Sequence, residues 1–327
     1  MKTSLQNKVM EYTNIYEQLH KSLKWKVTDS RTLMMVSSLY VVNGKHFDLI
    51  RFMEISDAIK KEVGLFSLLN SGHRFTIAAM LDIRFTDPIN MFSHLMKIYE
   101  ELVKSKFSRD QFTYVCAYLL LASETKDNLE TRIERSTLLY KGMKANHFFL
   151  TSSSDYPLAV LLSNEAGTVE ELLENIEHYY VKLNQFGFGK GNDLQFLSHI
   201  LSFHPANKDT VIERCITILD EVKRRGKVKL RKMHYPVLGL LSFIDNGIQE
   251  LETIEEIALQ LNQHKRLKWH KDINLIMACH FLISEKIEDS SLISTNMYAI
   301  IESVIQAQQA AMVAVVTGTA VSASSNS

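Results

Sequence analysis

The sequence predicts an all-α fold built from stacked helical hairpins, and two observations carry that prediction. The 327 residues include only 12 glycines and 4 prolines, so residues that break helices are scarce. Apolar runs that end in serine also recur every 39 to 42 residues, a spacing typical of helical-hairpin repeats. These terminal serines are Ser123, Ser163, Ser202, Ser242 and Ser284.

Each repeat is predicted to contain two helices. The first is amphipathic, as in 169–185, where the apolar residues follow a helical stripe. The second is shorter and apolar on most sides, so we expect it to be the more buried of the two. The prolines fall at predicted helix ends, where a missing N–H costs little: Pro88, Pro157, Pro205 and Pro236.

A large apolar residue occupies the turn between the two helices of each repeat. We expect these side chains to pack into the core and hold the turn in place. They are Phe66, Phe107, Phe148, Phe188, Val228 and Trp269.

The pattern divides the chain into three parts. Residues 27–310 form the repeat domain, with six clear hairpins from about residue 50 to 290, a degenerate hairpin before them, and a final amphipathic helix at 295–309. Residues 1–26 form a separate helix with an apolar seam, which either caps the open end of the stack or pairs with a second copy of the chain. Residues 311–327 are expected to be a frayed tail. The whole is predicted to be an α-solenoid-like superhelix, with a closed α/α toroid as the alternative.

Several segments resemble a known protein family. Segments 156–163 and 235–242 both begin Tyr-Pro and end Leu-Leu-Ser, 186–192 forms a glycine-rich turn, and the C-terminal tail is rich in alanine and serine. Together these features resemble an uncharacterised family of bacterial proteins, found mostly in bacilli and known as a domain of unknown function. The resemblance implies no activity and no catalytic residues.

Charge is sorted between the two kinds of turn. The chain carries 37 basic and 37 acidic residues, so it has no net charge. The turns from a first to a second helix nevertheless hold nineteen Lys or Arg and one acid, whereas the opposite turns hold eighteen acids and four basic residues. Helix dipoles explain acids at the starts of first helices and bases at their ends, but they disfavour bases at the starts of second helices.

The basic turns therefore suggest a candidate anion-binding edge, with a nucleic acid, an acidic partner segment or the acidic edge of another copy as its ligand. Solubility and helix capping are the competing interpretation. The candidate residues are Lys223, Arg224, Arg225, Lys227, Lys229, Arg231, Lys232, Arg266, Lys268, Trp269 and Lys271.

The sequence contains no recognisable catalytic motif, and we predict no cofactor. Phosphate-binding loops, nucleophile elbows and paired Cys-x-x-Cys motifs are missing, and the adjacent Cys279 and His280 are a weak zinc signal. The three cysteines lie far apart in apolar runs and are expected to be buried thiols. An enzyme stays an alternative if His73, Asp155 and His234 converge on the concave face.

We therefore expect a cytoplasmic binding or scaffold protein whose partner is a protein or peptide. A polyanion such as a nucleic acid and a homo-oligomer are the other partners considered. We predict neither a signal peptide nor a membrane span, because Met1 to Met10 lack an apolar core and the weakly polar stretch 310–323 is too short to cross a bilayer.

Overall fold

The computed structural model describes residues 2–27, 29–65, 67–123, 128–244, 246–288, 301, 303–309 and 312. All regular structure within these ranges is helical, which confirms the predicted all-α class.

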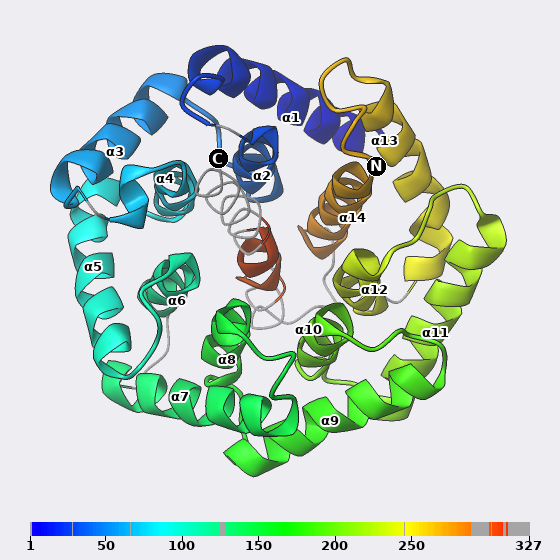
Figure 1. The fold of residues 1–327 in the computed structure, drawn as a ribbon. Helices are drawn as coiled ribbons and strands as arrows, with labels where there is room; N and C mark the ends of the chain where they lie inside the picture. The colour runs from blue at the N-terminus through cyan, green and yellow to red at the C-terminus, as the bar shows by residue number, and fades with distance from the viewer. Residues whose placement is uncertain are drawn as a thin grey trace, which may run out of the picture.

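The helices alternate between an outer and an inner ring (Figure 1). The outer ring consists of α1 (Lys2–Leu23), α3 (Leu49–Glu62), α5 (Pro88–Lys104), α7 (Leu129–Asn146), α9 (Val169–Gln185), α11 (Lys208–Arg225) and α13 (Leu251–Gln263). The inner ring consists of α2 (Ser30–Val42), α4 (His73–Arg84), α6 (Gln111–Ala122), α8 (Tyr156–Leu162), α10 (Asn192–Leu201), α12 (Tyr235–Ser242) and α14 (Lys271–Glu288). Each outer helix and the inner helix that follows it form one hairpin, and from α3 onward the outer helices begin 39 to 43 residues apart.

Short 3-10 turns lead into several of these helices, and polar side chains cap many of them. The 3-10 turns are η1 (Leu68–Asn70), η2 (Ser153–Asp155), η3 (Lys232–His234) and η4 (Gly247–Glu250). Asp87 accepts a hydrogen bond from the Asn90 N–H and precedes Pro88 at the first position of α5, as the sequence predicts.

The first and last hairpins contact one another, so the hairpins close into a ring (Figure 1). The Tyr12 ring of α1 meets the Phe281 ring of α14 edge to face, with 5.2 Å between centroids. Lys8 Nζ lies 3.4 Å from Glu285 Oε2 of the same inner helix. The chain therefore does not form the open superhelix that the sequence analysis places first.

The N-terminal helix takes part in this closure. Its apolar stripe, from Leu5 to Leu23, is buried against α2 and α14. The stripe is thus covered by the chain itself, and α1 lies in the outer ring as the first helix of the first hairpin.

The inner helices are buried around most of their circumference, whereas the outer helices bury only one stripe each. In α8, for example, every residue from Tyr156 to Leu162 is buried. This contrast agrees with the predicted amphipathic first helices and apolar second helices.

A C-terminal segment, 303–309, lies inside the inner ring (Figure 1). It is helical, as predicted, but it packs against α2 and α14 and does not continue the outer ring. The remainder of the predicted helix 295–309 and the tail 311–327 lie outside the described residues, apart from Ile301 and Met312.

Polar side chains hold this segment in place. Gln309 Nε2 donates to Ser38 Oγ at 2.7 Å and lies 3.2 Å from His280 Nδ1, while His280 Nε2 lies 3.1 Å from Gln308 Oε1. This pattern fits a neutral imidazole that donates from Nε2 and accepts at Nδ1. Gln306 Nε2 donates to Asn43 Oδ1 at 2.9 Å.

The turn residues correct one prediction. Phe107 and Phe188 are buried against Tyr156 and Tyr235, as expected. Phe148 and Trp269 are instead exposed, because Leu150 and Leu267, each two residues away, pack into the core in their place. Val228 is half-buried, and Phe66 lies outside the described residues.

The His280 contacts predict a pH-dependent stability. Burial lowers the pKa of His280 to about 4, below its ordinary value of 6.5, so the unfolded chain binds the proton first as the pH falls. We expect the free energy of unfolding to drop by about 2–3 kcal/mol between pH 6.5 and pH 4 through this group. Urea denaturation of the wild type and of His280→Gln across this range should show the difference. His46→Gln, which removes an exposed histidine, should leave the wild-type pH dependence in place.

Candidate interaction edge

The turns that join each outer helix to its inner helix lie along one edge of the ring. We call residues 24–27, 29, 63–65, 67–72, 105–110, 147–155, 186–191, 226–234 and 264–270 the turn edge. Seven of the candidate anion-binding residues lie on it, namely Lys227, Lys229, Arg231, Lys232, Arg266, Lys268 and Trp269. Lys223, Arg224 and Arg225 instead end α11, and Lys271 begins α14.

Hydrogen bonds connect neighbouring turns along this edge. The Ser108 N–H donates to the Tyr156 hydroxyl at 3.2 Å, and the Gly189 N–H donates to the Tyr235 hydroxyl at 3.0 Å. Between the last and first hairpins, Ser30 Oγ lies 3.1 Å from His270 Nε2. These contacts join the third turn to the fourth hairpin, the fifth to the sixth and the seventh to the first.

Exposed aromatic side chains gather on the turn edge. Trp25, Phe149 and Trp269 are 90%, 95% and 80% exposed, and Phe148 and Phe186 are also more than half exposed. Among the described residues, no other tryptophan, phenylalanine or tyrosine is exposed to this degree. Both tryptophans of the chain are thus on this edge.

Each tryptophan and Phe148 lie beside a lysine. The ammonium groups of Lys24, Lys144 and Lys268 lie 5.3, 5.6 and 5.0 Å from the ring centroids of Trp25, Phe148 and Trp269. These distances are typical of cation–π contacts. The exposed rings are thus set among positive charges and do not merge into one apolar patch.

The predicted basic cluster is largely paired with acids. Arg224 and Arg225 bind Glu221 and Glu255, and Arg231 binds Asp272 of the neighbouring hairpin at 3.1 Å. The other contacts are Lys223 with Asp220 at 3.9 Å, Lys227 with Glu255 at 3.5 Å, Arg266 with Glu17 at 3.0 Å, and Lys232 Nζ with the Lys190 carbonyl at 2.8 Å. Arg231 joins the two halves of the cluster, but these acids reduce its net charge.

The unpaired charges of the turn edge are lysines. Its three arginines all form ion pairs: Arg109 with Glu100, Arg231 with Asp272 and Arg266 with Glu17. Within the part of the chain that the structure describes, Lys227 is the turn-edge lysine that joins an ion pair. Lys26, Lys106, Lys190, Lys229 and Lys265 have none, nor do Lys268 and the adjoining Lys271.

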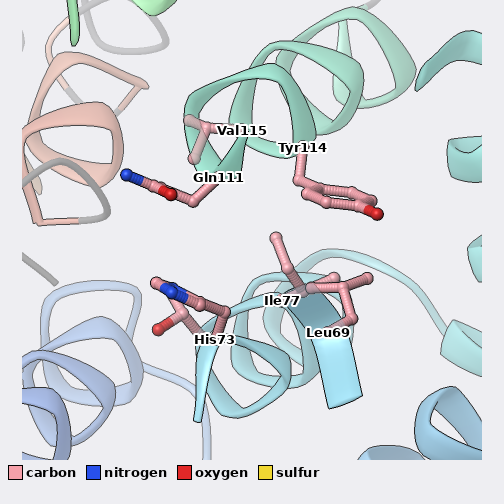
Figure 2. Close-up of a pocket in the computed structure, with 7 residues that line it drawn as sticks. Leu69, His73, Ile77, Gln111, Tyr114 and Val115 are labelled. Carbon is pink, nitrogen blue, oxygen red and sulfur yellow. The ribbon is translucent and has the colours of Figure 1, made fainter. Parts of the chain in front are cut away.

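His73, Asp155 and His234 do not form a common site. His73 lines a narrow pocket between α4 and α6, with Gln111 at the same end and the apolar Leu69, Ile77 and Tyr114 at the other (Figure 2). Burial lowers the pKa of His73. His234 lines a different narrow pocket, among α11, α12, α13 and α14.

Asp155 and His234 have a structural role at the starts of their inner helices. Asp155 Oδ2 accepts a hydrogen bond from the Ser152 N–H at 2.9 Å, and His234 Nδ1 accepts one from the Arg231 N–H at the same distance. Both side chains therefore close a capping box around a 3-10 turn. Sequence alone does not distinguish this role from catalysis.

A buried acid and histidine that the sequence analysis does not pair lie close together. Asp155 Oδ1 is 4.0 Å from His199 Nδ1, and neither ring nitrogen of His199 forms a hydrogen bond with a described group. Burial raises the pKa of Asp155 to about 6 and lowers that of His199 to about 3, so the imidazole is neutral at pH 7. Since His199 is fully buried, this pair is closed to a substrate in the observed arrangement.

Comparison with known proteins shows the family. Residues 15–310 match DUF4003, described as a protein family of unknown function. The uncharacterised protein YeaA of Bacillus subtilis (strain 168) is 39% identical, and the match covers 97% of each chain. The chain belongs to the DUF4003 family. No solved structure shows a significant match to it.

In this DUF4003 chain, the side chains of the adjacent Cys279 and His280 have different surroundings. Cys279 lines the same narrow pocket as His234, and burial raises the pKa of its thiol to about 12. His280 uses both ring nitrogens in the contacts with Gln308 and Gln309. In the described residues, no group of three or more His, Cys, Asp or Glu side chains could hold a metal, and no helix is long and apolar enough to cross a membrane.

The paired acids of the cluster differ in their predicted importance for stability. Glu255 is buried and binds both Arg225 and Lys227, whereas Glu221 lies at the surface beside Arg224. Removing one partner of a buried pair leaves the other charge uncompensated. We expect Glu255→Gln to lower Tm by about 5 °C and Glu221→Gln to lower it by about 1 °C or less. Equal shifts in a calorimetric comparison would contradict this assignment.

Proposed function

We propose that this DUF4003 chain is a binding protein that engages its partner through the turn edge. The observation that carries the proposal is the placement of the exposed aromatic side chains: Trp25, Phe148, Phe149, Phe186 and Trp269 all lie on that edge. Aromatic residues are enriched where proteins bind, relative to the rest of the protein surface.

The turns do not need these aromatic side chains as core residues. In three turns an apolar residue two positions away is buried instead: Val27 beside Trp25, Phe188 beside Phe186, and Leu267 beside Trp269. These buried residues anchor the turns, so the exposed rings are free to contact a partner.

The closed ring of paired helices supports the α/α toroid as the finer description of the fold. An enzyme with its site on the concave face of this ring is the alternative function. Segment 303–309 lies in the centre of this ring, and His73, Asp155 and His234 do not share a pocket. These observations favour the binding function over the enzyme.

The polyanion alternative has one specific observation in its favour, which is the set of unpaired lysines on the turn edge. The arginines that would give bidentate contacts with phosphate are already paired with acids. A protein or peptide partner is supported by the exposed aromatic rings alone.

Site-specific photo-crosslinking tests the proposal. A benzophenone amino acid replaces Phe149 on the turn edge in one variant and Ile89, which is exposed at the opposite edge, in the control. Both full-length variants are expressed in Bacillus subtilis and irradiated in the cells. We expect the adducts from position 149, whether with protein, nucleic acid or lipid, to exceed those from position 89 by about tenfold. Equal yields at the two positions would contradict the proposal.

A further inference from the structure

Building on the proposed function, we infer that the partner of the turn edge is the surface of an anionic lipid bilayer. The ring lies with this edge against the headgroups. Its exposed aromatic rings enter the interface between headgroups and acyl chains, and its unpaired lysines contact the lipid phosphates.

The first argument is the distribution of the aromatic rings. Trp25 belongs to the first hairpin, whereas Phe148 and Phe149 belong to the fourth, which lies across the ring (Figure 1). Phe186 and Trp269 belong to the fifth and seventh hairpins. A bilayer is a flat partner that all of these rings can contact at once, whereas a compact protein or peptide would cover only one side of the edge.

The second argument is the surroundings of each ring. Protein interfaces have a core that is depleted of charged residues. Here Trp25 stands between Lys24 and Lys26, and Trp269 follows Lys268. An aromatic ring next to an ammonium group suits the membrane interface, where the ring reaches the acyl boundary while the amine stays among the phosphates.

The third argument is the identity of the free charges. Arginine gives the planar, bidentate contacts that nucleic-acid recognition uses most, and the turn-edge arginines are occupied by Glu17, Glu100 and Asp272. The lysines that remain are compact charges, which suit attraction to a diffuse layer of anionic headgroups. Unpaired lysines on several hairpins therefore favour a lipid surface over a nucleic acid.

The charge of the opposite edge determines which edge of the ring faces the bilayer. Its described turns expose acidic side chains such as those of Asp87, Glu130, Glu170, Asp209 and Glu252, so an anionic bilayer repels that edge and attracts the turn edge. A chain with no net charge therefore has a defined binding face.

The two tryptophans provide a direct measurement. Both lie on the turn edge and are almost fully exposed, so their fluorescence reports contact at this edge and nowhere else in the chain. The full-length protein is titrated with vesicles of phosphatidylglycerol and phosphatidylcholine in equal parts, and with vesicles of phosphatidylcholine alone. We expect a shift of the emission to shorter wavelength with the first vesicles only, and its reversal by high salt.

Matched variants test the residues in a vesicle sedimentation assay. We expect Trp25→Ser combined with Phe149→Ser to lower the partition coefficient at least tenfold, and Lys26→Gln combined with Lys229→Gln and Lys265→Gln to lower it by about the same factor. The controls are Ile50→Ser with Ile89→Ser, and Lys208→Gln, at the opposite edge; they should bind like the wild type. Circular dichroism verifies that each variant is folded.

The outcomes separate this inference from the proposed function. Failure to bind anionic vesicles, or binding that the turn-edge variants do not weaken, overturns the inference. If position 149 still crosslinks to a protein or a nucleic acid in cells, the proposed function stands with a different partner. If vesicle binding and the preference for position 149 are both missing, both fail.

Discussion

The inner helices are mostly apolar and are buried around most of their circumference, and the rest of the architecture depends on covering them. A helix such as α8, with seven residues, is too short to be stable alone and needs contacts around its whole circumference. Its outer partner covers one side and its neighbours in the ring cover others. Closure extends this arrangement to the ends of the chain, because α2 and α14 then contact each other as well as α1. Segment 303–309 covers the inward sides of α2 and α14, and its Gln308 and Gln309 supply hydrogen-bond partners for the Ser38 and His280 side chains that it helps to bury.

Local pattern predicted the hairpins well and ring closure poorly, for a physical reason. The period and the proline positions are local, so they locate the helices at Pro88, Pro157 and Pro236 within a few residues. Whether the last hairpin meets the first depends on a small rotation per hairpin that adds up around the ring, and no residue of the sequence encodes it alone. The contact of Tyr12 with Phe281 joins positions almost the whole chain apart. For the same reason the stripe of α1 was predicted to be a cap or a dimer seam.

The sequence predicts where the candidate edge lies, but it does not predict which of the basic residues there are paired with acids. A count of charges within the turns gives a strongly basic edge, because the neutralising acids lie outside the turn boundaries. Glu221 lies one helical turn before Arg225, while Glu17 of α1 and Asp272 of α14 lie outside the turns that hold Arg266 and Arg231. The turn-edge arginines form ion pairs within the chain, whereas most of its lysines form none and remain at the surface. The exposure of Trp269 was also missed, since a residue two positions away competes for the same space and sequence alone does not rank Leu267 above it.

This competition makes the exposed rings informative. A turn needs one apolar anchor, and Val27, Phe188 and Leu267 fill that need in three hairpins. The neighbouring Trp25, Phe186 and Trp269 then contribute little to folding, and each leaves a large apolar surface in water. Solubility and helix capping are the competing interpretation of the basic turns. They account for the lysines but not for the aromatic rings between them. Because the rings recur at equivalent turns while the rest of the described surface exposes no other tryptophan, phenylalanine or tyrosine to the same degree, their arrangement points to a surface that the whole edge meets at once.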